Sequence, residues 1–318
     1  MKRYLNLWEQ DGRGTVKLRQ GGWNWGDWGN NIDMLSLYNL WYYLALQSQY
    51  NIAVELGYNK DADTYKGSLE SFHEAFNRTF WNDSLNAYRD PLYRGKTDDR
   101  TQALAVVSGM AGKEKYPALL KILNEEEHAS PYMEKYVFEA MMVMGFEEDA
   151  LARHKKRFSK MVNDQRFTTL FEGWGIGTEG FGGGTVNHAW SGGGATIASQ
   201  YITGISPLEP AYKRFQIKPQ PGKIKEAKAV VPSVKGEIIS EFKNGDKEFS
   251  LAVSIPTETE AVITLPPYNY ATININGNKV WQNGKFIDNK GTRPYNTGDG
   301  ISFIVPPGKF NVQGIFRK

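Results

Sequence analysis

The hydrophobic pattern changes period once along this chain, near residue 205, and that change limits the folds it can adopt. Before it, apolar residues such as Leu37, Leu40 and Leu44 recur every three or four positions, the spacing of a buried helix face. After it, short runs such as 236–242 and 249–255 alternate apolar and polar residues between Gly, Pro and Asn-Gly breakers. The sequence therefore predicts a helical domain over 1–204 and an antiparallel β-sandwich domain over 205–318.

The helical region divides into segments bounded by Gly, Pro or Asn. Asp33 lies at the start of the first segment, where an anion favours the helix N-terminus. Residues 81–86 are expected to form a turn, and short strands are expected after residue 205. The predicted helices cover residues 32–56, 63–80, 99–111, 115–125, 133–144, 147–162 and 188–201.

Composition excludes several classes of function. The chain has 318 residues, 40% of them hydrophobic, which is enough for one large or two ordinary cores. No apolar run approaches the roughly 18 residues of a membrane helix, and the net charge of +3 is spread along the chain, so we expect neither a membrane nor a nucleic acid as partner. The basic run 154–157 is expected at a solvated helix end.

The cysteine and histidine content excludes further kinds of site. The absence of cysteine removes disulfides, thiol nucleophiles and cysteine zinc sites. The four histidines are isolated and form no metal cluster: His73, His128, His154 and His188. Residues 1–9 contain no apolar secretion signal, so we expect a cytoplasmic protein, or a periplasmic or extracellular one if a signal lies on a missing segment.

Two long loops between the expected helices, 23–29 and 167–184, combine Trp and Gly with acids. Aromatic faces beside hydrogen-bonding groups bind sugar rings, and burial among aromatic side chains moves a carboxyl pKa toward working pH. Asp27 and Glu172 therefore fit glycoside hydrolysis, in which one carboxyl group protonates the leaving oxygen and the other activates water or attacks the sugar. A single Trp or acid is more often a packing residue or a helix cap, but the combination favours a carbohydrate site. The glycines at 182–184 open no Rossmann unit, so we expect no nucleotide.

Four motifs carry a resemblance to a known family. They are Trp25-Gly-Asp-Trp28, Thr101-Gln-Ala-Leu104, Thr169-Leu-Phe-Glu-Gly-Trp174 and Asn187-His-Ala-Trp-Ser-Gly192. In this order they resemble the C-terminal part of the catalytic domain of bacterial α-L-rhamnosidases, glycoside hydrolase family seventy-eight. Segments 229–239 and 249–256 resemble the small sandwich that closes those proteins.

The resemblance implies a fold and an activity. The fold is a partial (α/α)6-barrel followed by an antiparallel β-sandwich, and the activity is the hydrolysis of terminal α-L-rhamnose from a glycoside or polysaccharide. Related (α/α)6 hydrolases share the Trp-rich loops, so another glycosidase of this fold, such as an unsaturated glucuronyl hydrolase or a trehalase-like enzyme, stays open as an alternative.

The resemblance also implies roles for individual residues. The family inverts the anomeric centre, and Glu172 matches its general base, which would activate a water and would lie about 6.5–9.5 Å from the acid. His188 matches the family's substrate-contacting histidine, and Trp25 and Trp28 match the wall of the −1 pocket. Further candidates for sugar binding are Asp33, Trp174 and Trp190.

One motif of the family has no counterpart here. Its general acid lies in an Asp-Glu-Arg-x-Gly-Trp-x-Gly-Asp stretch well before the Trp25 loop, and the seven expected helices fall short of the barrel's twelve. We therefore expect a fragment whose missing N-terminal segment supplies the acid. An intact enzyme that uses Asp27 as its acid, and a non-catalytic carbohydrate-binding fragment, are the alternatives.

No cofactor is expected. Some relatives bind calcium, but the sequence contains no Asp-x-Asp-x-Asp spacing. Asp98 and Asp99 are expected in a solvated turn.

Overall fold

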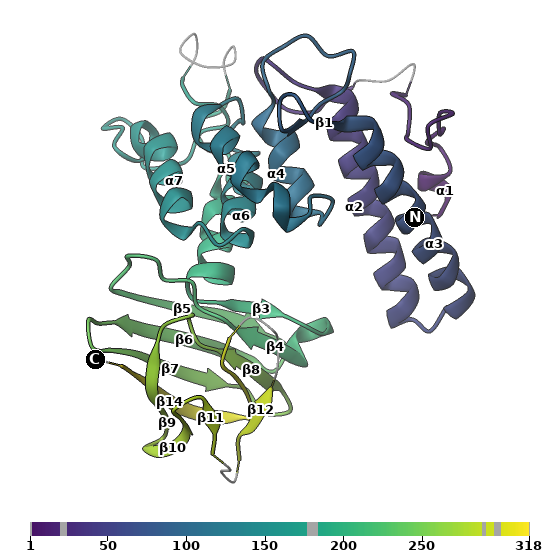
Figure 1. The fold of residues 1–318 in the computed structure, drawn as a ribbon. Coiled ribbons are helices and arrows are strands. Elements are labelled where there is room, and N and C mark those ends of the chain that lie inside the picture. The colour runs from purple at the N-terminus through teal and green to yellow at the C-terminus, as the bar shows by residue number, and fades with distance from the viewer. Residues whose placement is uncertain (1, 20–23, 177–183, 288–290, 296–299, 318) are drawn as a thin grey trace. The chain divides into compact units, whose positions relative to one another are not determined.

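The computed structural model describes residues 2–19, 24–176, 184–287, 291–295 and 300–317 (Figure 1). The chain forms two compact units, Met1–Gly194 and Ala195–Lys318. Among the described residues, no helix has the length and apolar character needed to cross a membrane.

The first unit is helical, with one short hairpin. Its elements are α1 (Lys2–Leu5), α2 (Met34–Glu55), α3 (Asn59–Phe80), β1 (Trp81–Asn82), β2 (Ala87–Tyr88), α4 (Asp99–Val107), α5 (Tyr116–Glu125), α6 (Glu134–Val143) and α7 (Glu147–Val162). A single 3-10 turn, Lys113–Lys115, precedes α5.

Two features organise this unit. Helices α2 and α3 lie side by side as a hairpin, with Tyr43 stacked on Phe72 at a ring distance of 6.0 Å (Figure 1). Helix α4 contacts α2, α5 and α6, and its residues 99–106 are all buried. A helix that is buried on every side belongs to the interior of a domain, so the polar residues at its start need partners inside the protein.

The helix predictions are confirmed with shifted ends, except for 188–201, where a single helix is wrong. That stretch contains a 3-10 helix (Ala189–Gly192), α8 (Gly193–Ile197) and a π-helical turn (Ala198–Ile202). The glycines permit close packing: a Cβ on Gly193 would lie 2.8 Å from the Lys135 side chain, and one on Gly194 would lie 2.3 Å from the His154 ring. Glycine also weakens a continuous helix.

The expected turn at 81–86 is part of the hairpin β1–β2. Trp81 pairs with Tyr88, and Asn82 with Ala87. Asn86 closes the turn at φ 49°, a left-handed conformation that asparagine tolerates. A hairpin of two residues per strand is too short to show an alternating pattern in the sequence.

The second unit is a β-sandwich of two sheets. A seven-stranded sheet has the order β11-β10-β9-β14-β7-β6-β5, and a five-stranded sheet has the order β12-β13-β8-β4-β3. The strands are β3 (Ile205–Pro207), β4 (Arg214–Ile217), β5 (Glu226–Ser233), β6 (Gly236–Asn244), β7 (Glu248–Ile255), β8 (Glu260–Thr264), β9 (Tyr270–Ile275), β10 (Asn278–Gln282), β11 (Lys285–Phe286), β12 (Arg293–Tyr295), β13 (Ser302–Val305) and β14 (Gly308–Phe316).

The antiparallel prediction for this unit holds with one exception. Strand β4 runs parallel to β8, with Phe215 beside Ala261, whereas the other strand pairs are antiparallel in the described residues. The core comes from alternating positions of both sheets: Phe215, Phe242, Phe249, Ile263 and Phe303 are buried.

Candidate functional site

An aromatic cluster in the helical unit joins residues that are far apart in the sequence. Trp190 stacks on Tyr132 at 5.1 Å between ring centroids and on Trp25 at 6.0 Å. Trp28 meets Trp25 edge-on at 6.1 Å. Three expected residues, Trp25, Trp28 and Trp190, therefore lie together, and Tyr132 completes the cluster they form.

Glu172 lies beside this cluster on a well-anchored backbone. Its amide donates to the carbonyl oxygen of Thr185 at 2.9 Å, and its own carbonyl accepts from the indole N–H of Trp190 at 3.3 Å. Its carboxylate Oε2 accepts from the Thr185 amide at 3.0 Å, and 22% of the side chain is exposed. Within the described residues the hydrogen bonds to this carboxylate involve only Oε2.

His188 and Glu172 face each other across the Thr185 hydroxyl. Thr185 Oγ1 lies 2.9 Å from His188 Nδ1 and 3.3 Å from Glu172 Oε2, and the two ionisable groups are 3.7 Å apart. A hydroxyl has one proton and two lone pairs. If it donates to the carboxylate, it accepts from Nδ1–H, and Nε2 of the imidazole becomes an acceptor for a ligand hydroxyl. The His188 ring also packs against Trp190 at 4.4 Å.

Trp174 lies in a different environment from the other tryptophans of the site. Its indole meets the Phe158 ring edge-on at 5.1 Å and carries the Arg157 guanidinium over its face at 4.2 Å. Its N–H donates to the carbonyl oxygen of Ala129 at 2.8 Å. These contacts anchor the loop that carries Glu172 to α7 and to the segment before α6.

Asp27 and Asp33 are buried in the protein. Asp27 Oδ2 accepts from Arg100 Nη1 at 3.1 Å and from the Ser130 amide at 2.9 Å. Asp33 caps α2 by accepting from the Ser36 amide at 3.3 Å, and its other oxygen accepts from the Asp90 amide at 2.8 Å. Burial raises the pKa of Asp27, against the opposing effect of Arg100, and burial also raises the pKa of Asp33.

Arg100 ties the Trp25–Trp28 loop to the start of α4. It is fully buried, and its Nε donates to Asp98 at 2.6 Å while Nη1 contacts Asp27. The remaining N–H groups donate to backbone carbonyls of residues 28, 30 and 31. Burial raises the pKa of Asp98 to about 7, with the neighbouring Asp99 adding to the shift and Arg100 opposing it. A planar guanidinium can satisfy this many acceptors at once, which an ammonium cannot.

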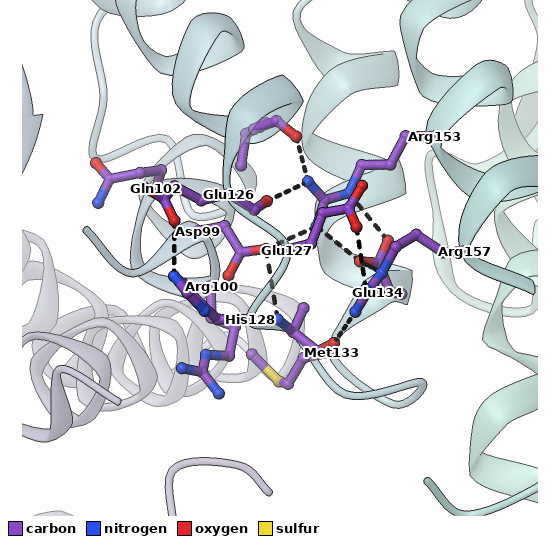
Figure 2. A network of polar contacts seen from close by, with 12 residues as sticks. Asp99, Arg100, Gln102, Glu126, Glu127, His128, Met133, Glu134, Arg153 and Arg157 are labelled. Atoms are coloured by element: carbon purple, nitrogen blue, oxygen red, sulfur yellow. Dashed lines mark hydrogen bonds and ion pairs between the residues drawn. The ribbon is translucent and has the colours of Figure 1, made fainter. Parts of the chain in front are cut away.

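A second buried arginine, Arg153 of α7, joins α4 to α6 (Figure 2). Its Nη2 lies 2.6 Å from Asp99 Oδ2 and 2.7 Å from Glu134 Oε1. Glu134 also accepts from Arg157 Nε at 3.0 Å. The expectation of a solvated turn at Asp98 and Asp99 is therefore wrong, because both carboxylates are buried and paired with arginines: Asp98 with Arg100, two positions along the chain, and Asp99 with the distant Arg153.

The basic run 154–157 is likewise not a solvated helix end throughout. The His154 ring is stacked on Phe138 at 4.6 Å, and burial lowers its pKa to about 4. Arg157 is largely buried in its ion pair with Glu134, whereas Lys156 is exposed. Because one turn of α7 separates Arg153 from Arg157, both can reach the same side of the helix, and this i, i+4 spacing was the available sequence signal.

Some expected residues cannot be placed. Trp23 and residues 177–183 of the long glycine-rich loop lie outside the described residues. Within the described ranges no three His, Asp or Glu side chains gather in a way that could hold a metal ion, so calcium stays an expectation of the resemblance alone.

Comparisons with known proteins agree with these motifs. Residues 1–201 match the family described as bacterial alpha-L-rhamnosidase 6 hairpin glycosidase domain, and residues 204–279 match bacterial alpha-L-rhamnosidase C-terminal domain. An alpha-L-rhamnosidase of Formosa agariphila is 28% identical over 159 residues, covering 47% of this chain and 16% of that protein. One from Alteromonas sp. is 23% identical over 239 residues, covering 70% of this chain and 25% of that protein.

Solved structures show the same fold. The alpha-L-rhamnosidase from Dictyoglumus thermophilum has a TM-score of 0.74 at 22% identity and covers 96% of this chain and 35% of its own. The Streptomyces avermitilis alpha-L-rhamnosidase complexed with L-rhamnose has a TM-score of 0.71 at 17% identity. The match covers 98% of this chain and 29% of the Streptomyces avermitilis chain. The chain thus spans about a third or less of the length of these relatives.

Proposed function

Because the chain belongs to the bacterial α-L-rhamnosidase family, we propose that it serves the hydrolysis of terminal α-L-rhamnose from glycosides or polysaccharides, with Glu172 as general base of an inverting mechanism. The observation that carries this proposal is the anchored Glu172 carboxylate beside an aromatic cluster. One oxygen is held by Thr185, and the other makes no hydrogen bond to the described residues, which suits a base that must orient a single water molecule.

The aromatic cluster suits the sugar that the proposal names. Rhamnose is a 6-deoxy sugar, so its methyl group favours an apolar wall while its hydroxyl groups need hydrogen-bond partners. Trp25, Trp28 and Trp190, with Tyr132, offer the wall. His188 offers Nε2 to a hydroxyl group while Thr185 occupies Nδ1.

We assign Asp27 and Asp33 to the support of the loops. Each carboxylate is buried and accepts backbone N–H groups, and Asp27 is in addition paired with Arg100. A general acid must touch the leaving oxygen, which an enclosed carboxylate cannot do. Our proposal therefore takes the acid from another segment of the enzyme, and Trp174 acts on the site through the loop that it anchors.

Turnover of an aryl α-L-rhamnoside tests this proposal. The assay compares the chain, its Glu172→Gln variant, and a longer chain where the coding sequence extends upstream. Removal of a general base lowers kcat by roughly 10²–10⁴-fold, and we expect a loss in this range in whichever chain is active. Glu70→Gln, on the exposed surface of α3, is the matched control and should leave turnover unchanged.

Binding separates the remaining outcomes. The intrinsic fluorescence of the tryptophans should respond to L-rhamnose in both the wild type and Glu172→Gln, because the wall is intact in both. Binding without turnover in every chain would favour the carbohydrate-binding alternative. Turnover that survives Glu172→Gln would refute the assignment of the base.

A further inference from the structure

The contacts of Trp174 assign a task to Arg157, which reaches the site from α7. We propose that Arg157 is a positioning residue that holds the loop carrying Glu172 in its working place. This inference rests on the proposed function, since it takes Glu172 as the base. It adds a buried ionic support to the groups that touch the sugar.

The Arg157 guanidinium makes three different kinds of contact at once. Its Nε donates to Glu134 Oε1 at 3.0 Å, and its Nη2 donates to the Ala129 carbonyl oxygen at 2.7 Å. The flat face of the group lies over the Trp174 indole at 4.2 Å. Only 12% of the side chain is exposed, so these contacts act with little screening by water.

Arg157 and Trp174 also share one acceptor. The Trp174 indole N–H donates to the same Ala129 carbonyl oxygen, at 2.8 Å. Because the guanidinium and the indole are stacked and donate to the same oxygen, each restrains the position of the other. These contacts therefore restrain the indole of Trp174, and through it the backbone of this residue.

Trp174 is two residues from Glu172, and the residue between them, Gly173, is buried. The other side of Glu172 is held by Thr185 and by the Trp190 N–H. Release of Trp174 would free one of the two anchors of the base. A shift of about 1 Å in a reacting group can lower turnover by roughly 10²-fold.

The support of Arg157 is itself buried and bound on several sides. Glu134, which pairs with Arg157, also receives both Nε and Nη2 of Arg153, and Arg153 is bound to Asp99 of α4 (Figure 2). The Ala129 amide donates to the same Asp99 at 3.4 Å. Ala129, whose carbonyl oxygen accepts from Arg157, is thus bound by the same network that binds Glu134.

The segment before α6 also contributes to the aromatic wall. The Ser130 amide donates to Asp27 at 2.9 Å, and Tyr132 stacks on Trp190. Because Ala129 precedes these residues directly, the anchor of the base and the anchor of the wall lie on one short segment.

Arg157→Lys tests the inference, because lysine keeps the charge and loses the fork and the flat face. The matched control is Arg78→Lys on α3, where an exposed arginine donates to the Arg13 carbonyl oxygen at 3.1 Å. Two quantities are measured in both variants: hydrogen exchange of peptides covering 126–131 and 171–176, and kcat and KM on an aryl α-L-rhamnoside.

We expect faster exchange at 171–176 in Arg157→Lys, with unchanged exchange in α2 and α3, which shows that the fold is intact. In the active form of the enzyme kcat should fall by roughly 10–100-fold while KM changes less than about twofold, since the aromatic wall remains. A merely structural role would lower the amount of folded enzyme and leave kcat per folded molecule unchanged.

Exchange at 171–176 equal to that of Arg78→Lys would overturn the inference, whatever the activity. Faster exchange without a fall in kcat in an active enzyme would also overturn it. Because exchange needs no substrate, it decides the positioning of the loop even if the wild type hydrolyses no rhamnoside, in which case the proposed function fails by itself.

Discussion

Replacement of Glu134 by glutamine isolates the energetic contribution of the buried ionic network. The Glu134 carboxylate is fully buried and accepts from Arg153 Nη2 at 2.7 Å, Arg153 Nε at 3.2 Å and Arg157 Nε at 3.0 Å. Glutamine is nearly the same size, but it offers one acceptor oxygen and places an NH₂ group against a guanidinium. The change therefore removes the charge and at least one of the three bonds without making a cavity.

The magnitude follows from these contacts. A hydrogen bond to a charged group contributes about 1.5–3 kcal/mol, and loss of one partner of a buried ion pair costs about 3–5 kcal/mol. We expect Glu134→Gln to lower the free energy of unfolding of the helical unit by about 4 kcal/mol. In a unit of this size each kcal/mol lowers Tm by roughly 2–4 °C, so the expected decrease is about 8–16 °C.

Differential scanning calorimetry measures the transition, and circular dichroism at 222 nm identifies it as helical. Glu139→Gln is the matched control, since it makes the same change on the same helix, where Glu139 lies 3.8 Å from Lys135 in a partly exposed pair. Such a pair contributes at most about 1 kcal/mol, so the control should lose no more than about 4 °C. Equal Tm values for the two variants would refute the reasoning, because they would mean that desolvation cancels the attraction in the network.

Three further predictions concern the pH dependence of stability and two glycine positions. His154 has a pKa of about 4 in the folded protein because it is buried, so between pH 6.5 and 4 only the unfolded chain binds the proton. The free energy of unfolding should fall by about 3 kcal/mol over this interval, and His154→Gln should remove that part of the pH dependence in urea titrations. Gly67→Ala should stabilise α3 by about 0.5–1 kcal/mol, since a Cβ there meets no atom within 4 Å. Gly314→Ala should destabilise the β-sandwich, because its Cβ would lie 2.4 Å from the Tyr270 ring; a higher Tm in Gly314→Ala or a lower one in Gly67→Ala would contradict these assignments.

The sequence predicts much of the fold because most elements carry a local periodicity. The apolar spacing of α2 and α7 and the alternation in β6 and β7 are long enough to identify their type. The wrong helix prediction also has a local cause. The segment 188–201 has the right apolar spacing, but its glycines allow close contacts that break the helix into three.

The groups predicted to contact the sugar are visible in the sequence because they are clustered there. Trp25, Asp27 and Trp28 lie within one motif, and Glu172 and Trp174 lie within another. Tyr132 was missed because nothing near it is unusual, and only the fold brings it to Trp190. A resemblance to a family identifies motifs, but it does not identify the residue that completes a cluster from another segment.

The buried charges were missed for a stronger reason, since a charged residue in a sequence is expected to be solvated until its partner is known. Arg100 pairs with Asp27 across 73 positions, and Arg153 with Asp99 across 54. No local pattern specifies such pairs. Their charges do carry one requirement, since a buried carboxylate needs a cation nearby. Asp99, once placed in the buried helix α4, therefore requires a cation from another segment, whereas Asp98 at the N-cap is paired with Arg100 of α4 itself. The helical position of α4 therefore predicts the network, and the network in turn brings together the loops of the candidate site.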